Sequence, residues 1–279
     1  MKKILITAKH SYIGNAFAAW AADKYNTEYI SCRTEEWRKT DFSNYDVILH
    51  VAGIAHVSTD PNMESQYYKV NRDLTIELAT KAKAAGVNQF IFLSSIIVYG
   101  DEKRIIDEST IPKPSNFYGN SKLQAEEGIK PLNCDNFRIA ILRPPMIYGK
   151  GSKGNYPKLA KAARKLPVFP DIDNQRSMLH IDNLCEFMRL MIENKESGLF
   201  FPQNSEYVKT SEMVKAIAEV YGRKVKLTKI FNPMLSIMGL KVGIINKVFG
   251  NLVYKQSISE YKENYRVRNL KESIMLTEK

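Results

Sequence analysis

Asp46-Val-Ile-Leu-His-Val-Ala-Gly53 is a short apolar run that ends in a glycine. Such a run, bounded by a turn residue, is typical of a strand that is buried on both faces of a sheet. Helical patterns over residues 14–22 and 67–85 lie on either side of it, and Gly86 closes the second of them. Further runs of the same kind occupy residues 3–7, 28–32, 89–94 and 137–142. This alternation predicts an α/β fold, a doubly wound parallel sheet with helices on both faces.

Polar and small residues follow several of these strands directly. In parallel sheets, ligands bind beyond the carboxyl ends of the strands. The residues at those ends are Ala8 to Gly14, Ser31 to Arg33, Ala52-Gly53 and Ser94-Ser95. We therefore expect one site along this edge of the sheet.

The pattern changes after Pro144-Pro145, where loops rich in glycine and shorter helical segments begin. These helices are expected over residues 156–165, 181–194 and 210–221. We predict a sheet domain over residues 1–145, to which a later strand and helix around 170–200 return. Residues 146–279 would mainly form a small mixed lobe.

The composition is that of an ordinary globular protein, with 279 residues, 44% hydrophobic and 25% charged. Its three cysteines, Cys32, Cys134 and Cys185, have no metal-binding spacing and are expected to remain reduced thiols. The first residues read as a strand rather than a signal peptide, and no apolar run is long enough to span a membrane. These features predict a cytoplasmic protein.

The net charge is +11, and the basic excess is concentrated late in the chain, with twelve Lys or Arg against four Asp or Glu from Tyr221 onward. An anionic small substrate, an acidic membrane surface and nucleic acid are the three kinds of partner that this charge fits. The basic residues are scattered rather than clustered with aromatic residues, which argues against nucleic acid.

The segment from Phe231 to Tyr254 is apolar but is interrupted by Pro233, Lys241 and Lys247. Packed helices of the second lobe are one interpretation, and a weak contact with a membrane surface is the other.

Tyr118-Gly-Asn-Ser-Lys122 carries a phenol and an ammonium four residues apart, on one face of a helix. A nearby ammonium lowers the pKa of a tyrosine from about 10 toward neutrality. A phenol tuned in this way exchanges protons with a hydroxyl at physiological pH.

Several pieces in fixed order resemble the extended short-chain dehydrogenase/reductases of the nucleotide-sugar epimerase/dehydratase type. The resemblance runs from Ile4 to about Asp182 and includes Asp46–Gly53, Val70-Asn71, Phe92–Gly100, Tyr118–Lys122 with Ala125-Glu126, Leu142–Gly149 and Arg176–Leu184. It implies a Rossmann-type domain that binds NAD or NADP, a C-terminal lobe that binds a nucleotide sugar, and a homodimer.

The resemblance also assigns catalytic roles. Tyr118 would be the acid or base at a sugar hydroxyl or keto group, and Lys122 would bind the nicotinamide ribose. Ser95 would hydrogen-bond the same sugar oxygen. Ser94 is the alternative, although Ser95 fits the family pattern better because it precedes Tyr99 by four residues. Asn71 would be a structural or relay group.

The cofactor loop departs from the family pattern Thr-Gly-x-x-Gly-x-x-Gly. Only Gly14 remains of its three glycines, because Ala8 and Ser11 replace the other two. The amides at the start of the following helix still suit a pyrophosphate, so we expect binding to be retained. Arg33 and Lys9 would meet a 2′-phosphate of NADP or would be solvated surface charges, and the family's acidic marker for NAD is absent. The other expected cofactor contacts are Tyr12, Ile13, Asp41, Phe42, the stretch Val51, Ala52 and Gly53 up to Ala55, Asn71, Ser94 and Pro145.

The substrate contacts that the resemblance implies are Ser95, Tyr99, Asn155 and Arg176. The last two suit an anionic diphosphate. Many 4-epimerases have Asn where this chain has Met146, and Arg-Pro-Pro-Met-Ile-Tyr-Gly also resembles reductases of 4-keto nucleotide sugars. A UDP-hexose 4-epimerase is our first expectation, a reductase the second and a dinucleotide-binding sensor without catalysis the third. Because no two histidines have metal-ligand spacing, we expect no metal.

Overall fold

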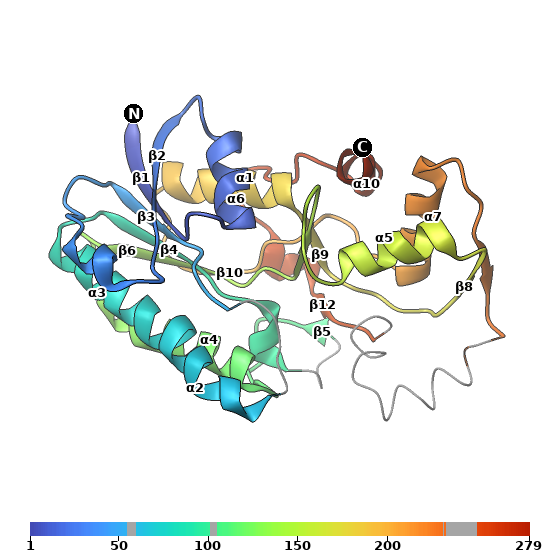
Figure 1. Ribbon diagram of the computed structural model, residues 1–279, viewed down its shortest axis with the longest axis horizontal. Helices are drawn as coiled ribbons and strands as arrows, with labels where there is room; N and C mark the ends of the chain where they lie inside the picture. Colours follow the sequence, from blue (N-terminus) through green and yellow to red (C-terminus); the bar gives the residue numbers. More distant parts are fainter. Residues whose placement is uncertain (55–59, 101–104, 231, 233–249) are drawn as a thin grey trace.

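A six-stranded sheet of parallel neighbours forms the centre of the larger half of the protein (Figure 1). The computed structural model describes residues 1–54, 60–100, 105–230, 232 and 250–279. Across the sheet the strands run in the order β10 (Gly198–Phe200), β6 (Arg138–Leu142), β4 (Gln89–Leu93), β3 (Val47–His50), β1 (Lys2–Thr7) and β2 (Tyr25–Ile30). The predicted parallel sheet is confirmed.

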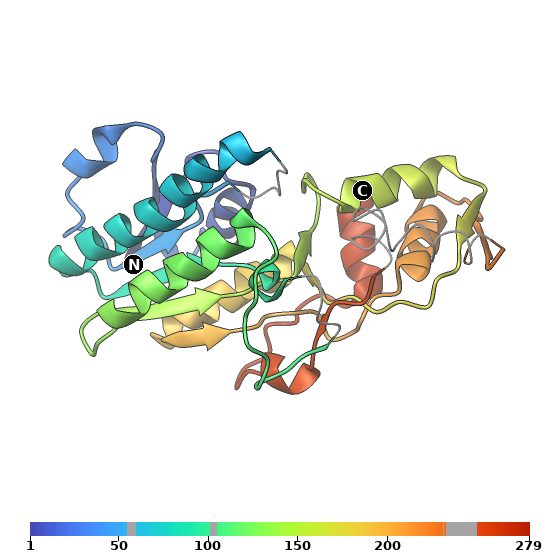
Figure 2. The same ribbon diagram turned by 90° about the horizontal axis from the view of Figure 1, so that it is seen from below.

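Helices cover both faces of the sheet, as a doubly wound fold requires (Figures 1 and 2). One face carries α1 (Tyr12–Trp20) and α6 (Ile181–Glu193), whose side chains share a core with Ile4, Ile6 and Leu49. The other face carries α2 (Glu64–Tyr67), the π-helical segment η3 (Tyr68–Asp73), α3 (Leu74–Ala84) and α4 (Phe117–Ile129). There Leu5 and Ile48 face a second core. Successive strand residues thus alternate between two cores.

The edge strand β2 begins three residues before the predicted strand over residues 28–32 and ends two residues before its end. Its buried residues are Tyr25 and Ile30, with polar residues between them, so it lacks the continuous apolar run on which the prediction depended. Such a mixture of buried and polar residues is typical of an edge strand with one solvated face.

The chain leaves β1 for β2 on one side and then returns to β3 on the other side. This reversal creates a crevice outside the carboxyl ends of β1 and β3, the position where such sheets bind ligands. Ala8 and Val51, which follow these two strands, therefore lie beside the expected site.

Three helices that follow β6 in the chain form a smaller cluster beside the sheet (Figure 1). Its helices are α5 (Tyr156–Lys165), α7 (Thr210–Val220) and α10 (Leu270–Glu278). Two-stranded pairs join β7 (Met146–Tyr148) to β9 (Met178–His180), β8 (Val168–Pro170) to β11 (Lys226–Thr228), and β5 (Ile105–Ile106) to β12 (Val253–Tyr254). The short helical turns are η1 (Glu35–Lys39), η2 (Pro61–Met63), η4 (Ile96–Tyr99), η5 (Lys130–Leu132) and η6 (Gln256–Ser259). A division into two domains at residue 145 stays a prediction, since β10 and α6 belong to the sheet and its cover.

Among the residues that the structure describes, no helix has the length and apolar character needed to cross a bilayer. Most of the segment between Phe231 and Tyr254, to which the two interpretations above apply, lies outside the described residues. Ala55, at the end of the expected cofactor stretch, lies outside them as well.

Candidate active site

Thr7, the last residue of β1, ties the two strands of the crevice together. Its hydroxyl oxygen accepts hydrogen bonds from the backbone amides of Val51 at 3.1 Å and Ala52 at 3.0 Å. The same oxygen lies 2.9 Å from His50 Nδ1. This contact fixes the start of the loop after β3, where the sequence predicted cofactor contacts.

His50 continues this line of polar groups into the core. Its Nε2 lies 2.9 Å from Thr75 Oγ1, and that hydroxyl donates to Asn71 O at 2.7 Å. Burial and the nearby Lys122 ammonium lower the pKa of His50 to about 3, so the ring is neutral. Since Thr75 uses its own proton on Asn71 O, Nε2 carries the imidazole proton and Nδ1 accepts from Thr7.

Asn71 is fully buried in the π-helical segment and holds the loop after β3 from both sides. Its Oδ1 accepts from Ile54 N at 2.8 Å, while its Nδ2 donates to Ile54 O at 3.2 Å and to Ser121 Oγ at 3.2 Å. A side chain on Gly53 would lie 2.9 Å from Asn71 Oδ1, so glycine is needed at this close approach. The prediction of a structural role for Asn71 agrees with these contacts.

Lys122 lies one turn after Tyr118 on α4, and its ammonium is buried. It donates to Leu93 O at 2.8 Å and lies 4.7 Å from the ring centroid of Phe92. An ammonium has three N–H donors, and Leu93 O is its one acceptor among the described residues. It is therefore held at the end of β4 with further capacity to donate.

Ser95 and Tyr118 meet at the carboxyl end of β4, as the sequence predicted. Ser95 caps the turn η4, accepting from Ile97 N at 3.3 Å, and its side chain is hydrogen-bonded to the Tyr118 hydroxyl. The Tyr118 ring packs edge-on against Tyr67, with centroids 6.0 Å apart. Asn116 begins α4 by accepting from Gly119 N at 2.9 Å, which fixes the position of Tyr118 in the first turn.

The expected lowering of the Tyr118 pKa is wrong. Burial raises the pKa of Tyr118 to about 12, and the Ser95 hydrogen bond offsets only part of this effect. The Lys122 ammonium is directed at Leu93 O and is not among the groups that act on the phenol. Spacing on a helix places two side chains on one face but does not aim one at the other.

The Lys122 ammonium makes stability depend on pH. Burial lowers its pKa from 10.5 to about 8, so between pH 8 and 10 the unfolded chain binds more protons than the folded one. Stability contributed by this group therefore rises with pH in that window, by at most about 1.4 kcal/mol per pH unit. We expect urea unfolding of Lys122→Met to lack this increment relative to the wild type. Parallel curves for the two proteins would contradict the buried ammonium.

Ala8 and Ser11 shape the cofactor loop. Ala8 has a φ of +77°, in the left-handed region that favours glycine. Ser11 begins α1 and its hydroxyl accepts from Gly14 N at 3.2 Å. One amide that we expected to remain available for a pyrophosphate is thus capped by the protein itself. Gly14 keeps the family's role, because a side chain there would lie 2.7 Å from Ile6 Cγ2.

The substitution Ala8→Gly should stabilise the protein by about 0.5–1 kcal/mol, because relief of the left-handed strain exceeds the added entropy of the unfolded chain. Chemical denaturation measures the change. Ala16→Gly, inside helix α1, is the matched control and should cost about 1 kcal/mol. Destabilisation by both substitutions would show that Ala8 is not strained.

The residues around the crevice fit a dinucleotide. Gly14 and Gly53 let the two loops pack closely on Ile6 and Asn71, and Lys122, beside Gly53, offers further N–H donors. The Tyr12 hydroxyl is buried and has no hydrogen-bond partner among the described residues. Burial raises the pKa of this tyrosine, so the group is a neutral donor beside the loop. Val51 and Ala52 are held by Thr7, as described above.

Ser94 and Tyr99 belong to a buried ionic cluster that the sequence did not reveal. The Arg143 guanidinium pairs with Glu126 at 2.6 Å and donates to Tyr99 Oη at 2.7 Å, and Ser94 Oγ donates to the Glu126 carboxylate. Both charged side chains are almost fully buried, with 0% and 3% exposure. Ser94 and Tyr99 thus have internal partners, and their contacts with cofactor and substrate stay predictions.

Three further expectations concern the adenosine end. Phe42 is 1% exposed and packs in the second core, so its expected contact with adenine is wrong. Asp41 accepts from Ser43 N at 2.9 Å in a surface turn. Arg33 and Lys9 are exposed after β2 and β1, and their contact with a 2′-phosphate stays a prediction.

Two other expected cofactor contacts, Ile13 and Pro145, lie within the protein. Ile13 packs against the first core, and Pro145 is buried beside Pro144, whose carbonyl oxygen accepts from Ile96 N at 3.0 Å.

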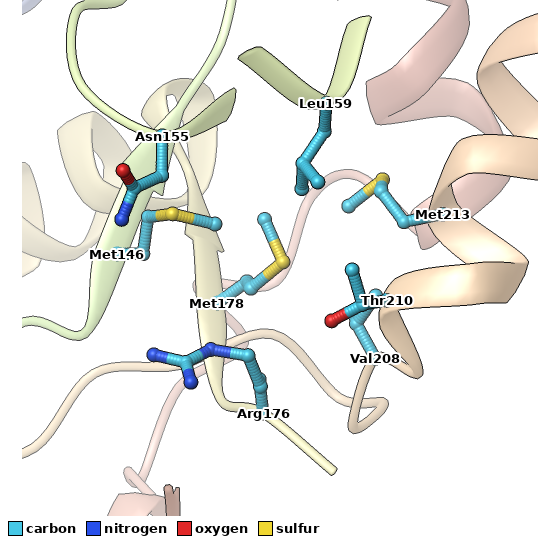
Figure 3. A pocket seen from close by; sticks show the side chains of 8 residues that line it. All are labelled: Met146, Asn155, Leu159, Arg176, Met178, Val208, Thr210 and Met213. Carbon is cyan, nitrogen blue, oxygen red and sulfur yellow. The ribbon is translucent and has the colours of Figure 1, made fainter. Parts of the chain in front are cut away.

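Asn155 and Arg176, the predicted substrate contacts of the second lobe, line one pocket together (Figure 3). Arg176 is held by a hydrogen bond of 2.9 Å from Nη1 to Gly250 O. The other six side chains of the pocket are Met146, Leu159, Met178, Val208, Thr210 and Met213. Sequence reasoning did not identify these six as a set. Within the described residues, no group of three potential ligands is placed to hold a metal ion.

Comparisons with known proteins agree with this geometry. A profile of the NAD dependent epimerase/dehydratase family matches residues 10–201. The chain is similar to a UDP-glucose 4-epimerase of Vibrio cholerae, with 33% identity over 194 residues, 64% of this chain. That match spans 59% of the relative's length.

A second relative matches over a longer stretch. It is an N-acetyl-alpha-D-glucosaminyl-diphospho-ditrans,octacis-undecaprenol 4-epimerase of Escherichia coli, 27% identical over 231 residues, 80% of this chain and 69% of the relative. Among solved structures, a UDP-glucuronic acid 4-epimerase of Bacillus cereus in complex with NAD superposes with a TM-score of 0.72 over 99% of this chain and 94% of that one. At 17% identity this likeness concerns the fold alone.

Proposed function

Because the chain belongs to the NAD dependent epimerase/dehydratase family, we propose that it is a 4-epimerase acting on a hexose carried by a diphosphate. The observation that carries this proposal is the meeting of Ser95 and Tyr118 at the end of β4, with the Lys122 ammonium one turn behind. A hydroxyl, a phenol and an ammonium at a strand end suit proton transfer coupled to hydride transfer. The 4-epimerases of Vibrio cholerae and Escherichia coli described above share this substrate feature, a sugar on a diphosphate.

The roles of the side chains follow from their positions. Ser95 would hold the C4 oxygen by a hydrogen bond, and Tyr118 would take and return its proton. Lys122 would bind the ribose of the cofactor with the donors that Leu93 O leaves to it. When bound, the nicotinamide accepts and returns a hydride, and its oxidised form favours the phenolate of a nearby tyrosine.

Gly14, Gly53 and the first turn of α1 would hold the dinucleotide, with the Tyr12 hydroxyl as an added donor. NAD or NADP would serve, and Arg33 with Lys9 is the pair that would favour the second. We also propose that residues up to about 145 act mainly in cofactor binding and later residues in substrate binding. A homodimer stays our expectation for the assembly.

A 4-keto sugar reductase is the second candidate. The high pKa of Tyr118, about 12, favours it, because a phenol that keeps its proton is a donor to a keto oxygen. The same residues would then catalyse only the reduction of the keto group.

Stoichiometry with the cofactor distinguishes the two reactions. The full chain is incubated with NAD or NADP and UDP-glucose or UDP-N-acetylglucosamine, and in a parallel assay with NADPH and a 4-keto nucleotide sugar. Product and reduced nicotinamide are followed together in both. An epimerase forms the C4 epimer without net change in reduced cofactor. Consumption of one NADPH for each 4-keto sugar supports the reductase and overturns the epimerase. Absence of turnover with every diphosphate sugar, including the esters described below, overturns both.

A further inference from the structure

We propose that the pocket of Figure 3 takes the first isoprenyl units of a polyprenyl diphosphate sugar rather than a nucleobase. This inference rests on the proposed function and specifies the group beyond the diphosphate. The two similar 4-epimerases differ in this same group, which is uridine in one substrate and undecaprenol in the other.

The pocket lies between a strand pair and two helices. Met146 and Met178 are register partners across β7 and β9, Leu159 comes from α5, and Met213 comes from α7. Figure 3 shows these four side chains pointing toward one another around the same space. About 300 Å³ of space lies among and in front of these side chains, a volume that includes open solvent, and the enclosed part is about the size of one water molecule.

The lining suits an aliphatic chain better than a base. The eight side chains that the structure describes around the pocket include five aliphatic or thioether groups and no aromatic ring on which a base would stack. Thr210 is already engaged, since its hydroxyl accepts from Asn174 Nδ2 at 2.9 Å. A polar base edge would therefore meet mostly methyl and thioether groups and lose hydrogen bonds with water. Methionine adapts its shape to flexible apolar ligands.

Arg176 supplies the charge that the diphosphate of such a ligand requires. Its guanidinium lies at the side of the pocket nearer to Met146 and Asn155 (Figure 3). Met146 follows Pro144 by two residues, and Pro144 O accepts from the backbone amide next to Ser95. The pocket thus adjoins the segment that carries the proposed sugar site, and a cationic side chain is part of its lining.

Exposed aliphatic residues and lysines near the C-terminal end of α5 also suit a lipid-linked substrate. Leu166 and Val168 are exposed there, and Ile230, two residues after the paired strand β11, is 82% exposed. Lys165 and Lys229 adjoin Leu166 and Ile230 in sequence, Lys226 is the register partner of Val168, and all three lysines are exposed. Exposed aliphatic residues among lysines match the interface of an anionic membrane, where a polyprenyl diphosphate resides.

Binding tests the proposal without requiring turnover. Dissociation constants of the full chain are measured by titration calorimetry for ethyl diphosphate, farnesyl diphosphate and UDP. Farnesyl diphosphate is kept below its critical micelle concentration. We expect farnesyl diphosphate to bind at least about tenfold more tightly than ethyl diphosphate, and UDP to resemble ethyl diphosphate. Tighter binding of UDP than of farnesyl diphosphate, or equal binding of the two alkyl esters, overturns the proposal.

Variants locate the binding. Met146→Asn should reduce the advantage of the farnesyl ester about fivefold, and the nearly isosteric Val208→Thr provides a second variant if the first does not fold. Met275→Asn, at an exposed methionine of α10 outside the pocket, is the matched control and should leave the advantage unchanged. If folded pocket variants retain the full advantage, the apolar group binds elsewhere and the proposal fails.

A turnover assay keeps this proposal separate from the proposed function. The ethyl, farnesyl and uridine esters of N-acetylglucosaminyl diphosphate are compared as substrates. A lower KM for the farnesyl ester supports the inference. Turnover of the uridine ester with the lowest KM overturns the inference and leaves the 4-epimerase standing.

Discussion

Tyr118→Phe is expected to reduce turnover about 1,000-fold, because the ring remains while the proton at the C4 oxygen loses its carrier. Phenylalanine fits the same packing against Tyr67, so the variant should fold and still bind the cofactor. Steady-state epimerisation of a diphosphate sugar measures the first effect, and titration with NAD or NADP measures the second.

Tyr68→Phe is the matched control for this experiment. Tyr68 lies in the π-helical segment and accepts from Asn120 Nδ2 at 2.7 Å, so its hydroxyl also contacts α4 but not Ser95. We expect its turnover to stay within about threefold of the wild type, as for the loss of one peripheral hydrogen bond. Unchanged turnover in Tyr118→Phe would falsify the proposed mechanism, whereas turnover lost with that hydroxyl also dismisses a sensor without catalysis.

Glu126→Gln is expected to lower the free energy of unfolding by about 3–5 kcal/mol, because it leaves the Arg143 guanidinium buried without a counter-charge. The carboxylate accepts from Nε and Nη2 of Arg143, with distances of 3.0 Å and 2.6 Å. It also accepts from Ser94, so a neutral amide disturbs the whole cluster. Urea unfolding of the two proteins at pH 7 gives the difference.

The neighbouring Glu127→Gln changes the same residue type at an exposed position of the same helix and should stay within about 0.5 kcal/mol of the wild type. Replacing both partners, Glu126→Leu with Arg143→Met, should restore much of the lost stability, because no unpaired charge remains. Equal free energies of unfolding for Glu126→Gln and Glu127→Gln would show that the buried Glu126–Arg143 pair is not ionised.

The strands of the central sheet could be predicted because their burial is local in origin. β3 and β4 are apolar at almost every position, so their runs in the sequence mark both their existence and their ends. Helix α5 likewise begins and ends where the sequence indicates. The edge strand β2 was predicted with the wrong bounds, and the π-helical form of the helix around Asn71 was not predicted, because solvent on one face and an inserted turn leave no apolar pattern.

The site could be predicted only as a set of residues at strand ends. Ser95 and Tyr118 were correctly expected to meet, whereas the partners of Ser94, Tyr99 and Phe42 were not. The partners of Ser94 and Tyr99 come from α4 and the residue after β6, and Phe42 packs in the second core, so all three depend on tertiary packing. The Glu126–Arg143 pair joins two such elements, and neither residue carries a local signal of the other.

Tyr254 has a consequence for how the protein is made. Its hydroxyl donates to Arg143 O at 2.8 Å, and its strand pairs with β5 at Ile105–Ile106. During synthesis on the ribosome, residues 1–145 emerge well before Tyr254 does. The contacts of Tyr254 and its strand with Arg143 and β5 can therefore form only after the late segment has emerged. We expect nascent chains that stop short of Tyr254 to be sensitive to protease around Ile105, and full-length chains to become resistant on release.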